Sequence, residues 1–120
     1  MKRNKQLSEN FLEKIPKHSS EIGWNSEEDN LVTLSIENKG FFNKIAQKFF
    51  KKPKISYIHL DELGSFIWRQ INGKKTVHLI GESVEEFFGE KAHPLYERLL
   101  KFFQILESYN FISWEEKDNI

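Results

Sequence analysis

Apolar and polar residues alternate over residues 32–37, which is the pattern of a strand with one buried face. A polar cluster at residues 25–30 comes before this stretch and is typical of a turn. Together with the apolar residues that precede the cluster, the pattern predicts a β-hairpin over residues 22–36. Residues 55–60 are rich in β-branched and aromatic side chains and predict a third strand, and residues 111–114 predict a short terminal strand.

Three segments in the second half of the chain carry apolar residues at helical spacing. The first is predicted between Asp61, which suits the N-cap, and the turn at residues 72–73. The second is predicted after Thr76 and ends before Gly89, which suits a left-handed position. The third has Pro94 at its first position, and its apolar stripe is broad. Such a helix packs on two sides, or packs on one side and binds with the other.

Residues 39–54 interrupt the strand pattern with a basic amphipathic segment. Five apolar residues recur there at helical spacing among six lysines and no acid, and Pro53 ends the segment. We expect an extra amphipathic helix here, whose phenylalanine face packs on the domain, lies on an anionic membrane surface, or contacts an acidic protein or nucleic acid. The polar residues 1–21 form either a short amphipathic helix that ends before Pro16 or a frayed tail.

The composition favours one domain in a reducing compartment. The chain has 120 residues, and its eighteen basic and eighteen acidic side chains cancel, so the net charge gives no support to nucleic-acid binding. The absence of cysteine excludes disulfides and thiolate sites. The sequence also predicts no secretory signal and no membrane span. Together these features favour the cytoplasm. We divide the chain into an extension (1–21), a domain (22–116) and a tail (117–120).

No pattern of residues indicates an enzyme, a cofactor or a metal site. The four histidines, His18, His59, His78 and His93, lack the spacing of zinc ligands. Paired carboxylates lie at predicted turns or on polar helix faces, and the glycines are too isolated to form a phosphate-binding loop. We therefore expect a protein without catalytic activity, cofactor or metal.

A recognisable order of residues runs from the third strand into the helices. It comprises His59-Leu60-Asp61-Glu62-Leu63-Gly64-Ser65-Phe66-Ile67-Trp68, Ile71-Asn72-Gly73 and Thr76-Val77, and later Leu99, Phe103, Leu106 and Asn110-Phe111-Ile112. This order resembles the PqqD-like family, whose members show an apolar residue, Asp or Asn, a nearby Gly, Ile-Trp, an Asx-Gly turn and Thr-Val. The resemblance covers about residues 55–114.

The resemblance implies an α+β, winged-helix-like fold, with a three-stranded antiparallel sheet packed on a three-helix bundle. It also implies a function, because such domains bind the leader segment of a ribosomally made precursor peptide and present it to a modifying enzyme, often of the radical-SAM class. In the family the leader adds as an extra strand to the third strand, in a cleft shared with the third helix. Carried over, the peptide-binding residues are Ser56, Tyr57, Ile58, His59, Leu60, Tyr96, Leu99, Leu100 and Phe103.

Two departures from the family pattern, the insertion at residues 39–54 and the first twenty residues, keep other functions open. A winged-helix DNA-binding regulator is disfavoured, because the third helix carries only Arg98 and Lys101 as bases, with acids beside them. The other alternative is an adaptor that acts through the insertion, either at a membrane surface or on a protein. An unpaired edge strand would also permit a homodimer.

Overall fold

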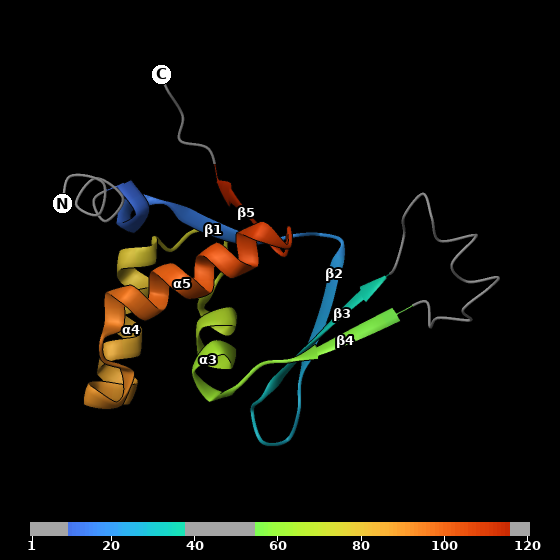
Figure 1. The fold of residues 1–120 in the computed structure, drawn as a ribbon, viewed down its shortest axis with the longest axis horizontal. Helices are drawn as coiled ribbons and strands as arrows, with labels where there is room; N and C mark the ends of the chain where they lie inside the picture. Colours follow the sequence, from blue (N-terminus) through green and yellow to red (C-terminus); the bar gives the residue numbers. More distant parts are fainter. Residues whose placement is uncertain (1–9, 38–54, 116–120) are drawn as a thin grey trace.

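The computed structural model describes residues 10–37 and 55–115, which form an α+β fold with antiparallel sheets (Figure 1). Its strands are β1 (Ile15–His18), β2 (Ile22–Ser26), β3 (Val32–Glu37), β4 (Ile55–His59) and β5 (Ile112–Glu115). Its helices are α3 (Glu62–Gln70), α4 (Val77–Phe88) and α5 (Leu95–Ser108), with the 3₁₀ turn η1 (Gly89–Ala92) between α4 and α5. The predicted amphipathic helix at residues 39–54 lies outside the described residues.

The predicted hairpin and third strand form one sheet with the order β2-β3-β4. Ile22 pairs with Ile36 across β2 and β3, and β4 pairs antiparallel with β3. The alternation read from the sequence gives this sheet its buried face, since Val32 and Leu34 of β3 are fully buried. Figure 1 shows that α3 lies between this sheet and α4.

The predicted helix boundaries are confirmed by their caps. The Asp61 carboxylate accepts a hydrogen bond from the Gly64 N–H at 2.7 Å, and the Thr76 hydroxyl accepts one from the Leu79 N–H at 3.1 Å. Gly89 follows α4 with a φ of 62°, a backbone conformation that favours glycine. Pro94 is the N-cap of α5 and lies one residue before the position that the sequence suggested.

A second sheet, which sequence analysis did not predict, joins the two ends of the described chain. β1 pairs antiparallel with β5, with Ile15 opposite Glu115 and His18 opposite Ile112. The prediction of a helix or a frayed tail before Pro16 is therefore wrong at Ile15, although residues 10–13 are helical. The error has a physical reason, because the partner that makes this segment a strand lies about one hundred residues away in sequence.

The other edge of β1 is held by the loop between α3 and α4. The Gly73 N–H donates to the Pro16 carbonyl at 3.2 Å, and the Val77 N–H donates to the Lys14 carbonyl at 2.9 Å. The ring of Phe11 is buried and packs edge-on against Phe103 of α5 at 5.8 Å. Part of the predicted N-terminal extension thus contributes to the hydrophobic core.

Two glycines allow α5 to pack closely on the other helices. A Cβ on Gly64 of α3 would lie 3.2 Å from the Phe102 ring, and one on Gly81 of α4 would lie 3.0 Å from Leu99 Cδ1. Both distances are tighter than ordinary van der Waals contact, so the missing side chains make room for α5. Different residues of α5 thus face α3 and α4.

Candidate functional site

The exposed strand β4 lies at an edge of the three-stranded sheet. Among the strands that the structure describes, β3 is its one neighbour. All five residues of β4 are exposed, and Tyr57 is 61% exposed. An edge strand with such exposure presents backbone groups that another strand can pair with.

The hydrogen-bond pattern identifies which backbone groups of β4 point outward. The Leu60 N–H donates to the Val32 carbonyl at 2.9 Å, which marks these residues as a hydrogen-bonded antiparallel pair. Such pairs alternate along a ladder, so Ile58 directs its backbone groups toward β3. The N–H and C=O groups of Tyr57 and His59 then point away from the sheet, toward the open edge.

The two faces of β4 differ in character. Ile58 lies opposite Leu34, so its side chain shares the face of the sheet that packs on α3, yet it remains exposed. Tyr57 and His59 lie on the other face, where the His59 ring bonds to the Thr33 hydroxyl at 2.9 Å. A strand added beside β4 would therefore meet an apolar side chain on one face and polar or aromatic side chains on the other.

Ser65 of α3 fixes the end of β4 against β3. Its buried hydroxyl accepts a hydrogen bond from the Val32 N–H at 2.8 Å and donates one to the Leu60 carbonyl at 3.3 Å. One side chain thus ties two strands to the helix that follows them. Because this contact is buried and satisfied at both strands, it gives the edge a fixed backbone geometry.

The residues of α5 that the sequence assigned to the site fall into two groups. Leu99 and Phe103 are 1% and 0% exposed, so they belong to the core and could touch a peptide only if the core opened. Tyr96 and Leu100 are more accessible, but they line a concavity next to Phe11. None of these four side chains is brought to the edge of β4 by a contact that the structure describes.

A different stripe of α5 faces the α3 side. Phe102 packs over Gly64 of α3, Ile105 follows it at i+3 on the same helix face, and Tyr109 is the C-cap residue directly after α5. Ile105 and Tyr109 are both exposed although they are large and apolar or aromatic. Periodicity predicted the breadth of the helix but could not distinguish this stripe, since only the position of Gly64 shows which side faces α3. Figure 1 shows the C-terminal end of α5 on the sheet side of the molecule.

An aromatic cluster joins β1 and β2 to α3. The His18 ring stacks on Trp68 with centroids 4.0 Å apart, and Trp24 packs edge-on against both rings. The His18 Nε2–H donates to the Trp68 carbonyl at 2.9 Å, which fixes the proton on that nitrogen. Burial lowers the pKa of His18, and the hydrogen bond to Trp68 opposes this shift only in part.

The described residues show neither a metal centre nor a membrane span. Within residues 10–37 and 55–115, no three His, Cys, Asp or Glu side chains come together as metal ligands. No helix in the same ranges is long and apolar enough to cross a membrane. The geometry of this part of the chain offers a strand edge for backbone pairing and, on α5, exposed apolar side chains.

Comparison with known proteins gives one family. The sequence model of PqqD, described as coenzyme PQQ synthesis protein D, matches residues 31–112, which is more than half of the chain. The match includes β3, β4 and the three long helices. No curated protein and no solved structure matches the chain significantly.

Proposed function

The chain belongs to the PqqD family, and we propose that it captures the leader segment of a precursor peptide by strand addition to β4. The bound leader is presented to a modifying enzyme, which we infer to be of the radical-SAM class. Family membership supports a role in the synthesis of coenzyme PQQ or of a related modified peptide. The observation that carries the proposal is the outward direction of the backbone groups of Tyr57 and His59 at an exposed sheet edge.

Strand addition explains how one module could hold an extended peptide. The peptide backbone would pair with Tyr57 and His59, which gives affinity that depends little on the peptide sequence. Peptide side chains on the inner face would meet Ile58 and, with the added strand in place, the exposed stripe of Ile105 and Tyr109. We therefore move the helical part of the site from Tyr96, Leu99, Leu100 and Phe103 to this stripe.

The proposed role is binding without catalysis. Holding the leader raises the effective concentration of the segment to be modified at the partner enzyme, and no bond is made or broken by this chain. The rigid support of β4 by Ser65 serves this role, because a preformed edge loses little conformational entropy when a peptide binds.

The decisive experiment removes one outward N–H from β4. Proline lacks this donor and is tolerated at an edge position whose N–H faces solvent, so Tyr57→Pro should leave the fold intact. Binding of a synthetic leader segment, identified by a search for a short precursor gene beside the gene for this chain, should weaken about tenfold or more. Isothermal titration calorimetry measures the affinity, and circular dichroism checks the fold.

A matched control lies on the opposite edge of the same sheet. In β2, Ser26 also directs its N–H outward, because the Glu27–Leu31 hydrogen bond sets the alternation there. Ser26→Pro should therefore leave the affinity unchanged. If Tyr57→Pro binds the leader as tightly as the unmodified chain, or if both proline variants weaken binding equally, strand addition to β4 is wrong.

A further inference from the structure

A large concavity of the described structure lies away from β4, between α4 and the segment that leads into α5. We propose that this groove docks a basic amphipathic segment of a partner protein, one that carries lysine or arginine beside an apolar side chain. The groove has a volume of about 1190 Å³. The proposed leader site assigns no role to it, and the sequence had assigned one of the residues that line it, Tyr96, to peptide binding.

The floor of the groove is apolar and accessible. Leu79 of α4 and Tyr96 of α5 line it, and they are 46% and 49% exposed. Gly81 also lines the groove, and its missing side chain lets α5 approach α4 through Leu99. Exposed apolar side chains gathered in a concavity are a feature of protein-binding surfaces, where one inserted anchor excludes water.

The rim of the groove carries an excess of negative charge. Glu82, Glu85 and Glu86 all line it and are exposed. Among the described residues that line it, Lys75 is the sole lysine or arginine, and its ammonium group donates to the Gln70 side chain at 2.6 Å. His78 contacts Glu82 at 3.2 Å, and the lining holds three glutamates against this one lysine. This rim favours a cationic occupant and repels nucleic acid or an acidic peptide.

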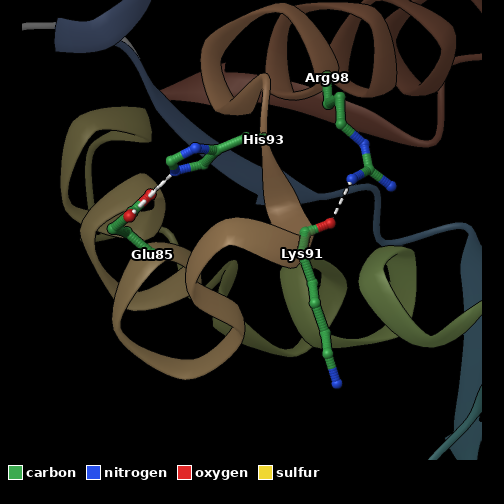
Figure 2. A network of polar contacts seen from close by, with 4 residues as sticks. All are labelled: Glu85, Lys91, His93 and Arg98. Carbon is green, nitrogen blue, oxygen red and sulfur yellow. Dashed lines mark hydrogen bonds and ion pairs between the residues drawn. The ribbon is translucent and has the colours of Figure 1, made fainter.

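The groove is held in shape before any partner arrives. Figure 2 shows the His93 ring against the Glu85 carboxylate, with Nε2 2.9 and 3.0 Å from the two oxygens. It also shows the Arg98 guanidinium donating to the Lys91 carbonyl at 2.9 Å. These contacts tie η1 and the first turn of α5 to the end of α4. A preformed groove loses less entropy when it is filled.

The position of the groove allows both surfaces to be occupied together. In Figure 1, α4 and the N-terminal end of α5 lie on one side of α3, and β4 lies on the other. A partner protein seated on α4 would therefore leave the edge of β4 open to an extended peptide. The groove proposal does not depend on the leader site, and either can fail alone.

The test uses a labelled synthetic peptide of lysine and leucine at helical spacing, titrated onto the full chain and followed by fluorescence anisotropy. We expect saturable binding that weakens as the salt concentration rises. The double change Glu82→Lys with Glu86→Lys should weaken binding about tenfold or more. Leu79→Ser should also weaken it, because the apolar anchor loses its contact. A counterpart peptide with glutamate in place of lysine should not bind.

The matched control reverses two exposed carboxylates elsewhere, by Glu27→Lys with Glu28→Lys in the turn between β2 and β3. It changes the net charge by the same amount and should retain binding. Equal losses in both double variants would overturn the proposal, because the attraction would then be general. A dimer of the unmodified chain would also overturn the proposal if the Glu82 and Glu86 changes dissociate it, as measured by sedimentation. The groove would then hold a second copy of the chain.

Discussion

His18 is the residue at which the two sheets and α3 meet. It belongs to β1, stacks on Trp68 of α3 and contacts Trp24 of β2. Its hydrogen bond to the Trp68 carbonyl requires a proton on Nε2, which the neutral ring already supplies. Protonation of the ring would therefore add a charge to a partly buried site.

This position predicts a stability that depends on pH. Because burial lowers the pKa of His18 in the folded state, the unfolded chain takes up a proton more readily. The contribution of His18 to stability should be complete above the ordinary imidazole pKa of about 6.5 and should decline as the pH falls below it. Urea denaturation over a series of pH values measures this decline. His18→Gln should flatten it, and a pH profile equal to that of the unmodified chain would contradict the assignment.

Residue-scale prediction from sequence succeeded where the interaction is local. The caps formed by Asp61 and Thr76 bond to N–H groups three residues on, so they can be read from neighbouring residues. The role of Ser65 could not be read in this way, because its hydroxyl binds Val32, thirty-three residues earlier. Nothing near Ser65 in the sequence indicates this distant partner.

At the scale of elements, the junction between β4 and α3 decides how firmly the proposed edge is held. One residue separates the Leu60 contact to β3 from the start of α3, and Asp61 caps that helix. We expect Asp61→Ala to lower the free energy of unfolding by about 1 kcal/mol, because the Gly64 N–H loses its acceptor. Urea denaturation checks this value. Asp61→Asn should restore most of the loss, and a variant as stable as the unmodified chain would show that the cap contributes nothing.

The helix α5 shows what element-scale prediction cannot supply. Its length, its start near Pro94 and its broad apolar stripe all follow from the sequence. The helices that pack on α5 decide which part of the stripe belongs to the core. Leu99 and Phe103 are buried, whereas Ile105 stays exposed. The resemblance assigned Leu99 and Phe103 to the peptide site, and periodicity alone could not show that both side chains lie in the core.

At the scale of the whole molecule, the fold extends beyond the segment that identifies the family. The family match begins at residue 31, but the core includes Phe11, and β5 pairs with β1. Lys17 of β1 and Glu115 of β5 form an ion pair at 3.2 Å across that sheet. Hydrophobic periodicity carries no information about strand partners so far apart, and this is why β5 was predicted and its partner was not.

This arrangement predicts that the N-terminal residues are required for folding. Phe11→Ala should cost about 3–5 kcal/mol, which is a large part of the 5–15 kcal/mol that stabilises a typical domain. Ile105→Ala, at an exposed site, should cost much less. A chain that begins at residue 19 loses Phe11 and β1, and it leaves the Gly73 and Val77 N–H groups without acceptors. We expect its thermal unfolding, followed by circular dichroism, to lose its cooperative transition. If the shortened chain instead unfolds cooperatively at the temperature of the full chain, the first residues are an extension after all, and the domain begins near residue 22.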